Sequence, residues 1–154
     1  MIDKRAITLI KKHEGFSAKA YKCPAGILTI GYGTTQYSNG KKVKENDTIT
    51  QEQAEKEVCD FCEKFYSKTI SVVEKKRQEQ LNQNQICALC SLIYNIGEEQ
   101  FLSSKCFQYL CNKNDKKALE NWNWISAKGK TLPGLIKRRN EEIELFFNIK
   151  NFIK

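Results

Sequence analysis

Three side chains near the amino terminus have types and spacing that suit acid chemistry. Glu14 is followed by Cys23 nine residues later, and Thr29 stands six residues after Cys23. A carboxylic acid can donate a proton, and a threonine hydroxyl can both donate and accept a hydrogen bond. A cysteine thiol carries no full charge near neutral pH unless its pKa of about 8.5 is lowered. Glu14 is therefore the candidate proton donor of this group.

Glu14 falls in the last turn of a predicted helix over residues 3–14. Asp3 is a suitable N-cap, and Gly15 supplies a stop at the carboxyl end. The negative end of the helix dipole and any apolar cover both disfavour a carboxylate at this position. We therefore expect Glu14 to hold its proton longer than a free glutamate does, which suits a general acid.

A glycine-rich segment follows, in which the helical periodicity of apolar residues gives way to turn and strand signals. Residues 23–26 form a turn signal, residues 27–30 read as a short strand, and Asn39-Gly40 is typical of a hairpin turn. Gly31 and Gly33 flank Tyr32, which indicates a close backbone approach or a positive φ. Residues 16–46 therefore predict a small antiparallel sheet region, too small to be stable alone.

The remainder of the chain has the periodicity of amphipathic helices. Thr50 opens one of them with the capping box T-Q-E-Q, and Asn82 caps another whose interior is apolar nearly all round, which is typical of a buried helix. The predicted helices span residues 50–66, 70–81, 83–96, 104–110, 115–122 and 135–147, with a loop of strong helix breakers at 128–134. We expect residues 83–96 to form the core of these helices.

These elements predict one α+β domain over residues 1–154. The chain is long enough to bury a core and shows no internal repeat, low-complexity linker or domain boundary. We expect a sheet lobe of residues 16–46 set against a helical lobe of residues 1–15 and 50–154. A cleft between the two lobes would then carry the active site.

The net charge of +8 favours an anionic partner, such as nucleic acid, a membrane surface or an acidic cell-wall polymer. Only four of the 26 basic residues are arginines, which argues against sequence-specific reading of bases. Ordinary solvated faces rich in lysine are the alternative explanation. No apolar run approaches the roughly 18 residues of a membrane span, and the first residues lack a signal-peptide pattern. We therefore expect no stable membrane insertion and no nucleic-acid partner.

The seven cysteines include two C-x-x-C pairs, Cys59–Cys62 and Cys87–Cys90. Together the pairs formally resemble a four-cysteine zinc site. Both pairs, however, lie inside helical patterns without a turn glycine, and buried free cysteine behaves as a small hydrophobic residue. We expect these thiols to pack in the core and expect no metal site, while zinc binding and disulfide bonding remain alternatives.

The spacing of Glu14, Cys23 and Thr29 matches the E-8-[D/C]-5-T pattern of phage-type lysozymes, the endolysins of glycoside hydrolase family 24. The resemblance extends beyond these three residues. The segments E-G-F at 14–16, Y-K-C at 21–23 and L-T-I-G-Y-G-T at 28–34 resemble the active-site hairpin of that family. The segments L-N-Q-N-Q at 81–85, Y-N-I-G at 94–97 and G-K-T-L-P-G-L-I-K-R-R at 129–139 resemble its later helices. The chain is thus similar to these lysozymes over nearly its whole length.

The resemblance implies hydrolysis of the β-1,4 bond between N-acetylmuramic acid and N-acetylglucosamine of peptidoglycan, without a cofactor. Glu14, Cys23 and Thr29 would be the catalytic residues, and the family pattern admits cysteine where many relatives have aspartate. A histidine that often follows G-Y-G in the family is replaced by Thr34. The resemblance also implies sugar-binding and supporting residues: Tyr32, Asn95 and Gln100 in the cleft, and Arg138 and Arg139 in the last helix, one of which would pair with Glu14 or Asp3.

Two functions of different kinds are consistent with these residues. The first is a monomeric endolysin that is made in the bacterial cytoplasm, is released to the periplasm and cell wall, and lyses the host. The second is a lysozyme-like module that holds glycan or a partner protein without cleaving it. The complete set of Glu14, Cys23 and Thr29 favours the enzyme.

Overall fold

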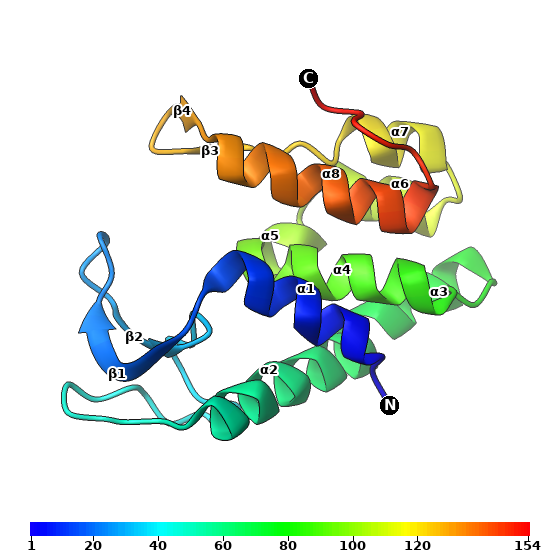
Figure 1. The fold of residues 1–154 in the computed structure, drawn as a ribbon. Coiled ribbons are helices and arrows are strands. Elements are labelled where there is room, and N and C mark those ends of the chain that lie inside the picture. The colour runs from blue at the N-terminus through cyan, green and yellow to red at the C-terminus, as the bar shows by residue number, and fades with distance from the viewer.

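A sheet lobe lies at one end of the molecule and helices fill the rest, as the computed structural model of residues 1–154 shows (Figure 1). The sheet lobe contains two paired strands, β1 (Ser17–Lys22) and β2 (Leu28–Gly31). The helices and the second strand pair are, in order, α1 (Lys4–Glu14), α2 (Gln51–Phe65), the π-helical turn η1 (Tyr66–Ile70), α3 (Ser71–Arg77), α4 (Gln83–Ile96), α5 (Glu98–Leu102), α6 (Lys105–Cys111), α7 (Asp115–Glu120), β3 (Ser126–Ala127), β4 (Lys130–Thr131) and α8 (Pro133–Phe147). The predicted α+β class is confirmed.

The ends of α1 are fixed by the residues that the sequence indicates. The Asp3 side chain accepts a hydrogen bond from the backbone N–H of Arg5, which caps the first turn. Gly15 has a φ of 68°, and its N–H donates to the carbonyl of Lys11. Helix α1 therefore ends at Glu14, and the chain turns directly into β1.

The paired part of the sheet lobe is smaller than residues 16–46. In the antiparallel pair, Tyr21 lies opposite Thr29 and Lys22 lies opposite Leu28. Between β2 and α2 the chain forms only isolated bridges, one of which joins Gln36 to Lys42 across the Asn39-Gly40 turn. Short strands with few partners leave most of this lobe irregular, so its position depends on packing against the helices.

The predicted helix over residues 70–81 is wrong at both ends. Helix α2 begins after the predicted Thr50 capping box and continues without a break through η1 into α3, since residues 66–70 contain neither glycine nor proline. The helix ends at Arg77 because Gln78 adopts a left-handed conformation, with a φ of 57°. One long helical rod therefore runs from the sheet lobe to the far end of the molecule (Figure 1).

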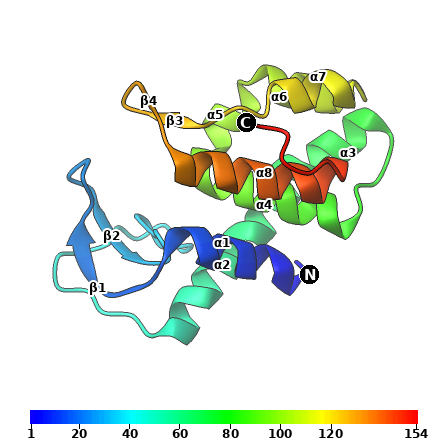
Figure 2. The ribbon, with the colours of Figure 1, turned by 45° about the horizontal axis from the view of Figure 1, so that its top comes forward.

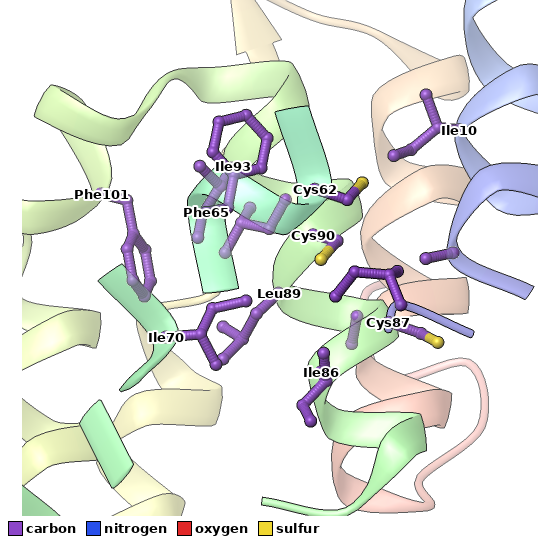
Figure 3. Packing of buried hydrophobic residues seen from close by; sticks show 14 of the residues in the cluster. Ile10, Cys62, Phe65, Ile70, Ile86, Cys87, Leu89, Cys90, Ile93 and Phe101 are labelled. Carbon is purple, nitrogen blue, oxygen red and sulfur yellow. The ribbon is translucent and has the colours of Figure 1, made fainter. Parts of the chain in front are cut away.

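Helix α4 forms the core, as predicted from its apolar interior. Figures 1 and 2 show it lying between α8 on one side and α1 on the other. Its residues from Ile86 to Ile93 are all buried. Figure 3 shows Leu89, Cys90 and Ile93 packed among side chains of the neighbouring elements.

Three of the four cysteines of the C-x-x-C pairs pack in this core, as expected, whereas Cys59 is only half-buried and lies outside the cluster. Cys62, Cys87 and Cys90 are fully buried in the main apolar cluster, and all seven cysteines are free thiols. Contact with Cys62 and burial raise the pKa of the Cys90 thiol, so it stays uncharged. No group of three or more histidine, cysteine, aspartate or glutamate side chains is arranged to hold a metal ion.

The last third of the chain differs from the prediction in three details. A short helix, α5, forms directly after Gly97, and β3 and β4 pair across a tight turn where the predicted 128–134 loop begins. Helix α8 begins at Pro133, two residues earlier than predicted, because proline is favoured in the first turn, where its missing N–H is not needed. Helix α8 buries Ile143 and Phe146 and also the charged side chains Arg138, Arg139 and Glu142. No helix of the chain is both long and apolar enough to cross a membrane.

Candidate active site

Glu14 lies at the junction between the helices and the sheet lobe. Its side chain is 20% exposed and lies against Gly33 in the turn that follows β2. A Cβ atom at Gly33 would lie 2.5 Å from Oε2 of Glu14, and the φ of Gly33 is 77°. Only glycine satisfies both constraints, so the G-Y-G motif provides the space that the carboxylate occupies.

Replacement of Gly33 by alanine is expected to lower both stability and activity. The positive φ alone costs about 1–2 kcal/mol for a residue with a Cβ atom. Gly40 has a φ of 89° and open space where a Cβ atom would lie, so Gly40→Ala is a matched control with the same backbone strain. Urea unfolding and lysis assays should show a larger loss for Gly33→Ala. Equal losses in the two variants would mean that the contact with Glu14 has no importance.

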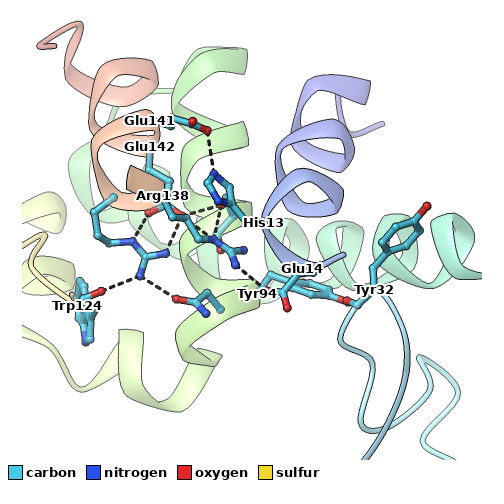
Figure 4. Close-up of polar contacts among 11 residues, drawn as sticks. His13, Glu14, Tyr32, Tyr94, Trp124, Arg138, Glu141 and Glu142 are labelled. Carbon is cyan, nitrogen blue, oxygen red and sulfur yellow. Dashed lines mark hydrogen bonds and ion pairs between the residues drawn. The ribbon is translucent and has the colours of Figure 1, made fainter. Parts of the chain in front are cut away.

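Arg138 is the arginine that pairs with Glu14. Its Nη1 donates to Oε1 of Glu14 at 2.6 Å, and its side chain is only 3% exposed (Figure 4). Its other nitrogens are fixed by Ser91 on α4, with Nη2 donating to the carbonyl oxygen at 3.0 Å and Nε to the hydroxyl at 3.3 Å. The structure thus decides between the two arginines of the last helix, and Asp3 pairs with Arg5 instead.

A second pair of charges is buried beside Arg138. Glu142, which is fully buried, lies 2.8 Å from Nε of Arg139 and 3.4 Å from Nε of Arg138. Burial lowers the pKa of Arg139, and the Glu142 carboxylate opposes that effect. The sequence indicates neither the burial nor the role of Glu142. Its spacing of three and four residues from the arginines was the available signal, because such residues share a helical face.

His13 lies outside this cluster, on the other side of Arg138. Its Nε2 is 2.8 Å from Oε2 of Glu141 (Figure 4), and Lys12 donates to the other carboxylate oxygen at 2.6 Å. Burial disfavours the charged form of Glu141, yet these two hydrogen bonds hold the pKa of that carboxyl below its usual value. The contact joins α1 to α8 next to the Glu14–Arg138 pair.

Cys23 and Thr29 lie together on the hairpin of the sheet lobe. The backbone N–H of Cys23 donates to the carbonyl of Ile27 at 2.9 Å, which holds the thiol beside β2. Backbone hydrogen bonds from Ile27 and Ala25, reinforced by the Thr29 hydroxyl, lower the pKa of the Cys23 thiol. Thr29 is 5% exposed, and its hydroxyl donates to the Ile27 carbonyl at 3.0 Å. The thiolate form of Cys23 is therefore favoured relative to that of an isolated cysteine.

The placement of Tyr32 contradicts the expectation that its ring binds sugar. The residue is only 4% exposed, and its ring lies 5.3 Å from that of Phe16 and beneath the ammonium group of Lys11. Its carbonyl accepts a hydrogen bond from the Tyr94 hydroxyl at 2.6 Å, and burial raises the pKa of that hydroxyl. Tyr32 thus holds the glycine turn against α4.

The other predicted cleft residues are accessible. Asn95 is exposed at the end of α4, where its side-chain oxygen accepts from Nη1 of Arg139 at 3.0 Å, and Gln100 is exposed on α5. Trp122 is fully buried, as expected of a core residue, and Trp124 is half-buried.

A groove of about 330 Å³ begins at Gly33, next to Glu14, and continues along the end of α4. Residues from both lobes line it: Gly33, Thr34, Thr35 and Gln36 from the sheet lobe, and Phe61, Lys64, Phe65, Lys68, Ile93, Tyr94, Gly97 and Glu98 from the helices. The sequence did not indicate the contributions of Phe61 and Lys64, because the core pattern of α2 gave no sign of a groove. A partly exposed carboxyl group thus lies beside a hollow between the lobes.

Comparison with known proteins agrees with this geometry. The family profile Phage lysozyme matches residues 11–142. The endolysin of Acyrthosiphon pisum secondary endosymbiont phage 1 is 40% identical over 151 residues, which cover 94% of this chain and 97% of the relative. The endolysin of Salmonella phage P22 is 37% identical over 150 residues, which cover 96% and 98%. The solved structure of an endolysin from Escherichia coli O157:H7 phage FAHEc1 is 33% identical, with a TM-score of 0.77 over 97% of this chain and 96% of that one. The chain belongs to the phage lysozyme family.

Proposed function

We propose that this glycoside hydrolase cleaves the β-1,4 bond between N-acetylmuramic acid and N-acetylglucosamine in peptidoglycan, with Glu14 as the general acid. The observation that carries the proposal is the placement of the Glu14 carboxyl group. It lies at the end of a helix, beside a groove, and is held by the buried Arg138 at 2.6 Å. A fixed and partly exposed acid of this kind fits protonation of a leaving sugar oxygen.

In the proposed reaction, Glu14 gives its proton to the glycosidic oxygen as the bond from that oxygen to the anomeric carbon breaks. Arg138 compensates the negative charge that Glu14 acquires in this step. A water molecule then bonds to the anomeric carbon and loses one proton to solvent, and Glu14 takes up one proton from solvent, so one water is consumed for each bond cleaved. Thr29 orients this water, and Cys23, as the thiolate that its lowered pKa favours, polarises it and stabilises the positive carbon.

Analysis of the products tests the bond that is cleaved. Purified peptidoglycan is digested, the new reducing ends are labelled with borohydride, and the sugars are released by acid and identified. We expect reduced N-acetylmuramic acid. Reduced N-acetylglucosamine, or bound glycan without new reducing ends, would contradict the proposal. Bound glycan without new reducing ends would instead support the alternative of a lysozyme-like module that does not cleave glycan. The endolysin relatives do not favour that alternative.

Selective alkylation of Cys23 is expected from its environment. A lowered pKa means that the thiolate forms at lower pH than in a free cysteine, so iodoacetamide should modify Cys23 first as the pH is raised toward neutrality. Cys59 is also half-buried, but burial raises its pKa, so it serves as the internal control. Peptide mass spectrometry follows both sites over time, and lytic activity should fall in step with modification of Cys23. Equal rates at the two sites would contradict the expected environment.

Substitution of Cys23 distinguishes its charge from its size. Cys23→Asp supplies a full charge of the kind that many relatives carry and should retain activity, whereas Cys23→Ser should lose about tenfold or more. Wild-type activity in Cys23→Ser would show that the thiol is not required and that Glu14 and Thr29 are sufficient for the reaction.

Three further properties are part of the proposal. We expect the protein to be a monomer. We also expect it to be made in the bacterial cytoplasm and to reach the wall after release, and the name endolysin of its relatives supports action at the wall. We also expect no functional binding of nucleic acid, although the charge of +8 permits weak, salt-dependent attraction. Light scattering, cell fractionation and a DNA-shift assay at increasing salt test these points in turn.

A further inference from the structure

Glu142 is a buried carboxylate that the proposed reaction does not use. It is fully buried on α8, and both of its oxygens are occupied. Oε1 accepts from the Ser91 hydroxyl at 2.6 Å, and Oε2 accepts from the Trp122 indole N–H at 3.1 Å. Burial of an ion is unfavourable unless it is paired and hydrogen-bonded. Because both carboxylate oxygens of Glu142 have partners, the side chains that contact this carboxylate are held in place.

The first group that Glu142 fixes is Arg138. Nε of Arg138 lies 3.4 Å from Oε1 of Glu142 and donates to the Ser91 hydroxyl, which itself donates to the same oxygen. With Nη2 bound to the Ser91 carbonyl, Nη1 is the part of the guanidinium that reaches Glu14. A planar guanidinium held at two of its three nitrogens has little freedom left, so Ser91, whose hydroxyl is bound to Glu142, sets the direction of Nη1.

The second group is Arg139, whose contacts lead in another direction. Its Nη2 donates to Oε1 of Glu142 at 2.9 Å, and its Nη1 donates to the side-chain oxygen of Asn95 at 3.0 Å and to the Trp124 carbonyl at 3.3 Å. Asn95 is exposed at the end of α4, two residues before the groove residue Gly97. Figure 4 shows the contacts spreading from Glu142 through the two arginines, toward Glu14 on one side and toward Trp124 on the other.

The charges of this cluster balance only while Glu142 is ionised. Arg138 and Arg139 carry two positive charges, and Glu14 and Glu142 carry two negative charges when Glu14 is ionised. Without the charge of Glu142, both guanidinium groups would compete for Glu14, and their mutual repulsion would be uncompensated in a buried place.

From these contacts we infer that Glu142 is a positioning residue that holds the catalytic acid through Arg138 and the exposed amide of Asn95 through Arg139. The inference rests on the proposed function for its catalytic consequence, because Glu14 is the acid only in that proposal. It assigns one buried carboxylate two effects, one on the chemical step and one on binding.

The test compares Glu142→Gln with wild type at several concentrations of solubilised peptidoglycan. Glutamine keeps the size of the side chain but removes its charge. We expect kcat to fall by about tenfold to a hundredfold, because the Glu14–Arg138 contact is misplaced, and the apparent KM to rise. Asn95→Ala should raise the apparent KM alone, and should raise it no further in the Glu142→Gln background, since the two residues act through one path.

A matched control separates positioning from stability. Ile143→Val changes the next residue of α8, which is also fully buried and belongs to the apolar cluster. It should lower the Tm without changing kcat or KM. A loss of kcat in Glu142→Gln no greater than in Ile143→Val, after comparison at equal distance below each Tm, would overturn the inference. So would wild-type kinetics in Glu142→Gln.

A second readout does not depend on catalysis. In ¹H–¹⁵N spectra of the folded protein, the side-chain amide of Asn95 and the Nε–H groups of Arg138 and Arg139 should shift or broaden in Glu142→Gln and stay unchanged in Ile143→Val. Unchanged signals in Glu142→Gln would overturn the inference whatever the activity. Wild-type protein that cleaves no peptidoglycan but shows the expected spectral change would overturn the proposed function alone.

Discussion

Replacing Glu14 by glutamine is expected to lower the rate of peptidoglycan hydrolysis by about 10²- to 10⁴-fold, the usual contribution of a general acid. The amide has nearly the same shape and still offers Arg138 an oxygen acceptor at the position now 2.6 Å from Nη1. It has no acidic proton to give to the leaving oxygen. The fold should therefore persist while the chemical step fails. Loss of turbidity of purified peptidoglycan and release of reducing ends measure the effect.

Glu144→Gln is the matched control for this prediction. Glu144 lies on α8 with a side chain 47% exposed, and its only ion pair is a 3.9 Å contact with Lys150. Its replacement changes the net charge by the same amount without touching the groove, so activity should remain at the wild-type level. Clearing by Glu14→Gln as fast as by Glu144→Gln would remove Glu14 from the mechanism.

Replacing Arg138 by methionine is expected to lower the free energy of unfolding by about 3–5 kcal/mol, the usual cost of removing one partner of a buried ion pair. The side chain is 3% exposed, and its loss removes the guanidinium donor from the Ser91 carbonyl and leaves Glu142 with one arginine instead of two. The negative charge that forms on Glu14 during the reaction also loses its compensation. Urea unfolding should show the lower stability, and lysis assays below the transition should show reduced activity.

The neighbouring Lys137 provides the control for Arg138. It is exposed on the same helix, so Lys137→Met removes one positive charge and adds the same side chain without disturbing a buried pair. Its effect on stability should stay within about 0.5 kcal/mol. Similar losses in the two variants would show that net charge, not the contact with Glu14 and Ser91, explains the result.

Local signals predicted much of the fold correctly. The Asp3 and Asn82 caps, the Thr50 capping box and the apolar interior of α4 are all present where the sequence indicates them. These features depend on residues that are close together within one helix. They can therefore be recognised from the sequence without knowledge of which elements pack against one another. The continuation of α2 through η1 into α3 was missed because the hydrophobic periodicity shifts at a π-helical turn, although no glycine or proline marks a helix end there.

The arrangement of the site could be predicted only in part. Glu14 and the glycine turn were indicated by type and spacing, but the choice between Arg138 and Arg139 depends on how α8 is rotated against α4. The burial of Tyr32 depends likewise on Phe16 and Lys11, which a strand pattern does not bring together. Contacts between distant elements decide these points. The catalytic roles stay predictions that the variants above test, and the single-domain organisation stays a prediction.

The contact between Glu14 and Arg138 spans 124 positions of the sequence. A ribosome makes the amino-terminal helix and the hairpin first, and a growing chain at that stage has the acid but no partner for it. The acid reaches its final position only after α8 has emerged and docked against α4. A truncated or unfinished chain therefore holds an incomplete site, so lytic capacity appears late in synthesis and is lost when the carboxyl-terminal helix is cut away.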